Sequence, residues 1–133
     1  MSALTAHLDV PLDRGAPGAA RRAVVAVLAG WGFRDPDWVD GAAVVVSELV
    51  TNAVRHGGGL VALQLEAHED RVVVSVADGS SVVPRRRDPD GGGGRGIALI
   101  EALAVGWSVQ NYRGGKRVLV ELHPCPGVAG WES

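Results

Sequence analysis

The sequence predicts one α+β domain in which helices cover one face of a mostly antiparallel sheet. Its 133 residues are close to the usual size of a single domain. Apolar residues make up 47% of the chain and charged residues 21%, so the chain has enough apolar side chains to bury a core. The expected elements follow the order β-α-α-β-β-α-β-β. Because the strands are grouped rather than alternated with single helices, this order favours an α+β sandwich.

The first part of the chain predicts a strand and two helices. Apolar residues alternate with polar or small ones over residues 4–12, which is the period of a half-buried strand. Residues 19–28 have a helical composition, and Pro17 is suited to the first turn of that helix. Asp35 followed by a proline is typical of a helix start. A second helix is therefore expected over residues 38–56.

The middle of the chain predicts a β-hairpin followed by a long loop. Residues 61–65 and 72–76 have the alternation of strands, and they flank a polar turn at residues 68–70. Residues 79–94 show no regular period and contain two prolines and four successive glycines. A loop of this length in a compact domain is usually functional, so we expect a mobile segment that takes part in a site.

The last part of the chain predicts a helix and a second hairpin. Residues 95–104 have a helical composition, and residues 105–111 and 116–122 form two strand-like runs around a pair of glycines. Two prolines then end the last strand. We therefore expect the domain to span residues 1–123 and residues 124–133 to form a frayed tail.

Composition and charge exclude several classes of protein. The formal net charge is −2, so no basic field points to direct binding of nucleic acid. The single cysteine, Cys125, allows no disulfide within the chain, and no Cys or His cluster has the spacing of a zinc site. No uncharged stretch is long enough to span a membrane, and Asp9 and Asp13 stand where a signal peptide would be basic or apolar. We therefore expect a cytoplasmic protein without membrane contact.

Three polar residues, Glu48, Asn52 and His56, recur at intervals of four along one border of the second predicted helix. The apolar stripe beside them is expected to be buried and consists of Trp38, Ala42, Val45, Leu49 and Ala53. The polar row is either an ordinary half-solvated helix edge or the wall of a cavity. In a cavity, Asn52 can coordinate a hard cation and Glu48 can take a proton. His56 is explained on its own by the helix dipole, which favours histidine at a helix C-terminus.

Asp78 stands at the end of a predicted strand, in phase with the apolar residues Val72, Val74 and Val76. A carboxylate that continues an apolar row needs a partner. Because a glycine and a serine follow it, Asp78 is suited to an ordinary turn. The alternative is an acceptor at the end of an apolar slot, where the carboxylate binds the exocyclic amine of a base. The residue by itself leaves both interpretations open.

A run of glycines over residues 91–94 leads through Arg95 and Gly96 into the last predicted helix. Glycines let backbone amides approach a phosphate, and the helix N-terminus adds the positive end of its dipole. A flexible linker is the alternative, although a linker has no reason to end in the first turn of an amphipathic helix. The arginines Arg85, Arg86 and Arg87 form either a solvated loop or a contact for a triphosphate or an acidic partner. The sequence lacks the Gly-Lys-Ser or Gly-Lys-Thr ending of a P-loop, which excludes that kind of nucleotide site.

In this order, these features resemble the motifs of the GHKL (Bergerat-fold) ATPase superfamily, which includes gyrase and the histidine kinases. Residues 47–56 resemble its N box, residues 74–79 its first glycine box and residues 94–100 its second. Within the superfamily, the chain is most similar to the anti-sigma factor serine/threonine kinases, in their short actinobacterial form with Lys116 before the last strand. The resemblance implies a two-layer sandwich with a mixed, mostly antiparallel sheet. It also implies ATP between the layers under a mobile lid at about residues 79–95.

The resemblance further implies a role for each site residue. Asn52 would ligate the Mg²⁺ that bridges the phosphates, and Glu48 would be the general base on the acceptor hydroxyl. Asp78 would accept a hydrogen bond from the adenine amine, while Gly94 and Gly96 would cradle phosphate. The same resemblance places four more residues beside the nucleotide, namely His56, Gly79, Arg95 and Ile97.

Two departures from the family pattern concern the base pocket. Gly79 is followed by Ser80 and Ser81, so the further glycines of the first box are missing. Arg117 stands where relatives often have a small hydroxyl residue near the adenine. Both departures predict an altered adenine pocket and weaker binding of nucleotide.

In function, the resemblance implies an ATP-binding anti-sigma factor that phosphorylates a STAS-type anti-sigma factor antagonist on serine or threonine. Such a protein regulates transcription by partner switching, with a sigma factor and the antagonist as partners and ATP and Mg²⁺ as cofactors. The alternative is a catalytically degenerate ATP-binding module that only sequesters a protein partner. A detached catalytic domain of a histidine kinase is a third option, but its linked dimerisation helix is missing from the sequence. Whether the protein forms a homodimer stays open.

Overall fold

The computed structural model describes residues 3–11, 13–56, 60–78, 94–112 and 115–128. Within these residues it contains three helices and five strands, in the order predicted from the sequence. The strands are β1 (Leu4–Pro11), β2 (Leu60–His68), β3 (Arg71–Asp78), β4 (Ala104–Tyr112) and β5 (Gly115–Leu122). The helices are α1 (Ala16–Gly30), α2 (Pro36–His56) and α3 (Gly94–Leu103).

The five strands form one sheet in the order β1-β2-β3-β5-β4. Each of the four ladders between these strands is antiparallel. The expected mostly antiparallel sheet is therefore confirmed, and the described strands include no parallel pair that would make the sheet mixed. β2 and β3 are joined as a hairpin, whereas β3 and β5 pair across a long interval of sequence.

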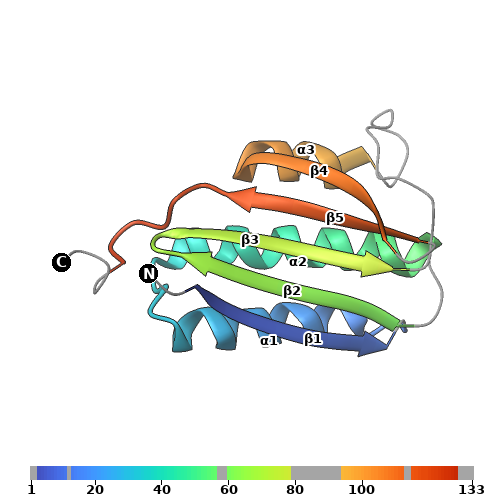
Figure 1. The fold of residues 1–133 in the computed structure, drawn as a ribbon, viewed down its shortest axis with the longest axis horizontal. Helices are drawn as coiled ribbons and strands as arrows, with labels where there is room; N and C mark the ends of the chain where they lie inside the picture. The colour runs from blue at the N-terminus through green and yellow to red at the C-terminus, as the bar shows by residue number, and fades with distance from the viewer. Residues whose placement is uncertain (1–2, 12, 57–59, 79–93, 113–114, 129–133) are drawn as a thin grey trace.

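All three helices lie on one face of the sheet, which confirms the predicted two-layer sandwich (Figure 1). α2 lies between α1 and α3 in the helical layer and packs against both. The core-facing residues of the central strands are buried and paired in register, for example Leu65 with Val74 and Leu63 with Val76. The core thus lies between the sheet and the helices, as the alternation along the strands predicted.

The start of α2 is fixed by the cap that the sequence predicted. The backbone N–H of Trp38 donates to the Asp35 carboxylate at 3.0 Å, which satisfies one of the unpaired donors of the first turn. The Trp38 ring stacks on Phe33 with ring centres 5.3 Å apart, and its indole N–H donates to the His123 carbonyl at 2.7 Å. The first turn of α2 is therefore tied to the end of the sheet. None of the described helices is both long and apolar enough to span a membrane.

The segment after β5 differs from the frayed tail that its prolines predict. Cys125 is only 3% exposed, and its backbone N–H donates to the Asp70 carbonyl at 2.8 Å. Val128 packs against the core as well. The prediction of a frayed tail is therefore wrong for residues 124–128, because prolines end a strand without keeping the next apolar side chains from burial.

Candidate functional site

α2 carries Glu48 and Asn52 one turn apart, and both residues are half-buried. Four of the five apolar residues predicted for the adjacent stripe are buried, and Trp38 is half-buried. The buried surface is wider than predicted, because three further residues of the helix are buried, namely Ala43, Val46 and Val50. With α1 and α3 on its two sides and the sheet across its front, α2 leaves its polar row at the border of the core.

α3 begins at Gly94, at the end of the glycine run and one residue before the predicted start. A helix of 10 residues presents backbone N–H groups and the positive end of its dipole at this point. The structure describes Gly94–Ile97 by their backbone. The side chains of His56, Arg95 and Ile97 lie outside the described residues, and so do Gly79, the three arginines and the rest of the expected lid over residues 79–93.

Asp78 is the last residue of β3 and continues the row of buried valines, as its spacing predicted. Its neighbour across the ladder is Lys116 of β5, just as Val76 is opposite Val118. Directly opposed residues of a ladder project from the same face of the sheet. Both charges therefore lie on the helix-covered face, at the end of an apolar row.

Asp78 and Lys116 form a buried ion pair. The Lys116 Nζ donates to both carboxylate oxygens of Asp78, at 3.1 Å each. Each side chain is 2% exposed. Because charges are costly to bury unless they are paired and hydrogen-bonded, each of these residues depends on the other for its place in the core. Lys116 supplies a partner that the carboxylate of Asp78 requires.

The ladder corrects the expectation that Arg117 lies near the base. Arg117 pairs with Ala77 and therefore belongs to the opposite face of the sheet from Asp78. Lys116 is the residue of this strand that faces Asp78, and the sequence contains a sign of it. Lys116 is two residues before Val118, so it is a charged residue in phase with the apolar row of its strand. The same argument singles out Asp78 on β3. Lys116 is also the only lysine in a chain with twelve arginines.

Several of the sequence-predicted site residues belong to elements that meet at one end of the molecule. Figure 1 shows the C-terminal end of α2, the end of β3, the beginning of β5 and the beginning of α3 toward the same end. The order of the strands produces this arrangement, since β5 runs antiparallel to β3 and starts where β3 ends. The Asp78–Lys116 pair thus lies at the same end of the molecule as the second half of α2, which carries Asn52.

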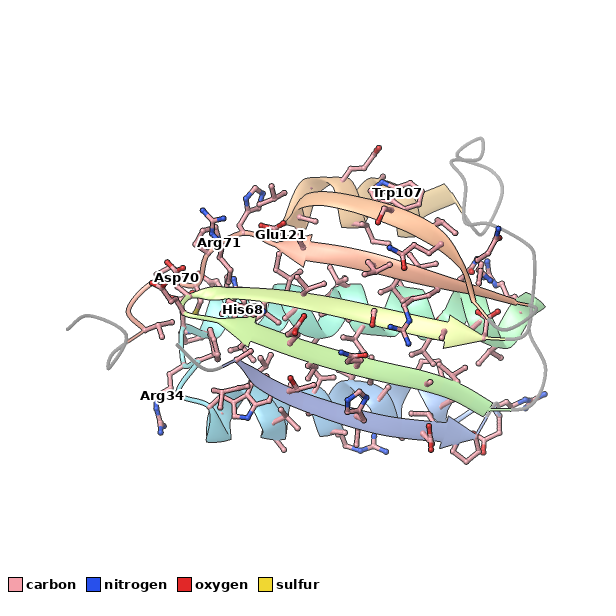
Figure 2. All side chains as sticks on the ribbon, viewed as in Figure 1. Arg34, His68, Asp70, Arg71, Trp107 and Glu121 are labelled. Carbon is pink, nitrogen blue, oxygen red and sulfur yellow. The ribbon has the colours of Figure 1, made fainter. Side chains whose placement is uncertain are left out.

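Charged residues on the other face of the sheet gather at the opposite end of β3. His68 lies 3.5 Å from Glu66, and Arg71 lies 4.0 Å from Glu121, with the side chains of His68 and Arg71 largely exposed and those of the two glutamates partly exposed. Figure 2 shows His68, Arg71 and Glu121 near the turn between β2 and β3, where β3 begins. Exposed pairs of this kind contribute little to stability. They are separate from the candidate site, which lies where β3 ends.

The residues at the site end fit a nucleotide with Mg²⁺. Asp78 offers a buried acceptor, which suits the exocyclic amine of a base. The start of α3 offers backbone donors and a positive dipole end, which suit phosphate. Asn52 offers an amide oxygen, a ligand type suited to Mg²⁺, which in nucleotide sites is held by few protein ligands together with the phosphates.

The chain matches the family model of the histidine kinase-like ATPase domain over residues 10–122. A similar solved structure is the histidine kinase domain from Erythrobacter litoralis EL346 blue-light activated histidine kinase, at 22% sequence identity and a TM-score of 0.46. The similarity covers 84% of this chain and 60% of that chain, so the present chain spans less than two thirds of that structure. None of the curated proteins matches the chain.

The matched range runs from the end of β1 to the end of β5. It therefore contains the polar row of α2, the Asp78–Lys116 pair and the start of α3. ATP binding, usually with Mg²⁺, is what such a domain implies, and the donors and acceptors at the site end fit that ligand. By the extent of this match, the chain belongs to the family of histidine kinase-like ATPase domains.

Proposed function

We propose that this protein is an ATP-dependent serine/threonine protein kinase and an anti-sigma factor, with a STAS-type anti-sigma factor antagonist as its substrate. The observation that carries the proposal is the pair of polar residues on α2. A half-buried carboxylate, Glu48, stands one helical turn before a half-buried amide, Asn52, in a chain of the ATPase domain family. The resemblance of residues 47–56 to the N box of the anti-sigma factor kinases supports the finer assignment.

In the proposed mechanism, each residue of the site has one task. Asp78 would orient the base, the backbone at the start of α3 would bind phosphate, and Asn52 would hold Mg²⁺ through its amide oxygen. Bound ATP would supply the γ-phosphoryl group, with ADP as the leaving group, and the metal would neutralise part of the charge that develops on transfer. Glu48 would accept the proton of the serine or threonine hydroxyl as that oxygen attacks the γ-phosphorus and the bond from this phosphorus to ADP breaks, so the acceptor becomes a better nucleophile.

Partner switching follows if the sigma factor and the antagonist are alternative partners of this chain. Phosphorylation of the antagonist would then return the chain to the sigma factor, and the protein would regulate transcription in the cytoplasm without touching nucleic acid itself. The formal net charge of −2 supports protein partners over nucleic acid, since it provides no overall attraction for phosphate backbones.

The kinase is tested by phosphotransfer from ATP to a purified STAS-type antagonist, comparing wild type with Glu48→Gln. The glutamine keeps the size of the side chain and removes its charge. We expect phosphotransfer in single turnover to fall by about 100-fold or more, with ATP affinity within a few-fold of wild type, because a general base acts on the chemical step.

The matched control is Glu66→Gln, which removes a carboxylate on the other face of the sheet. This control variant should phosphorylate the antagonist at the wild-type rate. Unchanged phosphotransfer in Glu48→Gln would contradict the base assignment. Loss of ATP binding in that variant would instead make the carboxylate structural or metal-linked.

A second candidate is a catalytically degenerate ATP-binding module that only sequesters a protein partner. The observation that favours it is the altered part of the site that would bind the base. Ser80 and Ser81 stand in place of further glycines, and Lys116 donates hydrogen bonds to the Asp78 carboxylate. Wild-type protein that binds Mg-ATP and a partner but transfers no phosphate to any antagonist would support this candidate over the kinase.

A further inference from the structure

We infer that Lys116 is a second base-reading residue, which acts with Asp78 to recognise adenine. The carboxylate of Asp78 accepts from the exocyclic amine, and the ammonium of Lys116 donates to a ring nitrogen beside that amine. This inference rests on the proposed binding of ATP and adds a specificity-determining residue to the site. It assigns a role in recognition to the only lysine of the chain.

The geometry places a donor and an acceptor side by side. The Lys116 Nζ lies 3.1 Å from each Asp78 oxygen, on neighbouring strands and on the same face of the sheet. Adenine presents the complementary arrangement, since its amine donor is flanked on each side by a ring nitrogen that accepts. One base edge can therefore meet both residues at once without separating them.

Lys116 keeps a hydrogen-bond donor for such a contact. An ammonium has three N–H donors, and among the described residues Lys116 donates only to the two oxygens of Asp78. Without nucleotide, the two charges satisfy each other, which explains how they are buried at this end of the sheet.

Stability alone gives a weak reason for this pair. Replacing a buried ion pair by well-packed apolar residues is often neutral or stabilising, and the pair here ends a row in which Val76 already faces Val118. A further valine pair would have continued the row. The two charges lie at the end of β3 and the beginning of β5. This is the end of the molecule that carries the site residues, so a role in the site explains their position better.

Recognition of the base by Asp78 and Lys116 together also predicts that the site rejects guanine. In the same orientation, the guanine carbonyl would face the Asp78 carboxylate. If Lys116 donates to N1, the protonated N1 of guanine would also face the Lys116 ammonium, whereas N7 accepts a hydrogen bond in both bases. In either case the hydrogen bond to Asp78 is replaced by a repulsive contact, and a buried site that loses a hydrogen bond in this way discriminates strongly.

The first experiment needs no variant. Titration calorimetry with Mg²⁺ measures the affinity of the wild-type protein for ATP, 1-deaza-ATP, 7-deaza-ATP and GTP. In each deaza analogue, carbon replaces one of the two ring nitrogens that flank the amine. We expect one analogue to bind about 10- to 100-fold more weakly than ATP, which is the loss of one hydrogen bond to a charged group, and the other to bind within a few-fold. GTP should bind at least about 100-fold more weakly than ATP.

The second experiment asks whether Lys116 supplies that bond. Lys116→Met should lose affinity for ATP by the same factor and should no longer distinguish ATP from the affected deaza analogue. Because Lys116→Met leaves the Asp78 charge buried alone and can unfold the chain, the double variant Lys116→Met with Asp78→Asn is measured beside it. Arg117→Met is the matched control, since it removes a positive charge from the next residue on the opposite face, and it should keep the wild-type discrimination.

Equal affinity of the wild type for ATP and both deaza analogues would overturn the inference. Discrimination that persists in the Lys116 variants would overturn it as well, because the bond would then come from water or another group. If the wild type binds no ATP, the proposed function fails and this inference fails with it. If ATP binds and only the deaza discrimination is missing, the proposed function stands and the role of Lys116 does not.

Discussion

At the scale of single residues, Cys125 shows how its position in the fold changes the chemistry of a side chain. Burial raises the pKa of its thiol above the ordinary value. A backbone hydrogen bond at Asp35 lowers the pKa in part, and the nearby charges of Asp35 and Asp70 raise it further. Since the thiolate is the reactive form, Cys125 is expected to be an unreactive thiol in the folded protein.

This expectation is tested by alkylation with iodoacetamide at pH 8. As the only cysteine of the chain, Cys125 gives an unambiguous signal. We expect the folded protein to react at least about tenfold more slowly than the same protein in denaturant, because both the fraction of thiolate and access are reduced. The raised pKa also means that this thiol stabilises the fold below its unfolded pKa and loses that contribution as the pH rises through its folded pKa. Equal rates in the folded and unfolded states would contradict the burial of Cys125.

At the scale of elements, the local pattern of the sequence was enough to predict the helices and strands. Alternation gave the core face of β2 and β3, and Asp35 gave the start of α2, because both depend on residues close together in the chain. The partner of Asp78 depends instead on the register between β3 and β5, which no local pattern specifies. The same limit explains why the burial of Cys125 against Asp70 was missed.

The cap of α2 carries a prediction at this scale. Asp35→Ala removes the acceptor of the Trp38 N–H, and helix caps of this type contribute about 0.5 to 2 kcal/mol. We expect the free energy of unfolding, measured by urea titration, to fall by about 1 kcal/mol. The control is Asp40→Ala, an exposed residue of the same helix, which should change stability by less than about 0.5 kcal/mol. Equal effects of the two variants would show that the cap contributes nothing specific.

At the scale of the whole molecule, ligand binding and folding are linked, since the family implies that the folded chain binds ATP, usually with Mg²⁺. A ligand at 100 times its Kd stabilises the folded state by about 2.7 kcal/mol. We therefore expect Mg-ATP at that concentration to raise the free energy of unfolding, measured by urea titration, by about that amount, and EDTA to remove most of the increase. Asn52→Ala should respond much less to Mg-ATP, because its site lacks the proposed metal ligand.

Gln64→Ala is the control for this measurement, since it removes an amide from the other face of the sheet. Its response to Mg-ATP should equal that of the wild type. If Asn52→Ala responds as strongly as the wild type with Mg²⁺ present, Asn52 does not hold the metal.

The order of the strands determines when these site residues come together as the chain folds. Asp78 and Lys116 are 38 residues apart, and the ladder that joins them links two hairpins, β2–β3 and β4–β5. Local hairpins form before distant strands pair, because closing a long stretch of chain costs entropy in advance. The two charges therefore meet only after the halves of the sheet have docked. If ATP binding requires both residues, ATP binds only after the sheet has formed and does not increase the folding rate. Its stabilisation of the folded state would then appear almost entirely as a lower unfolding rate.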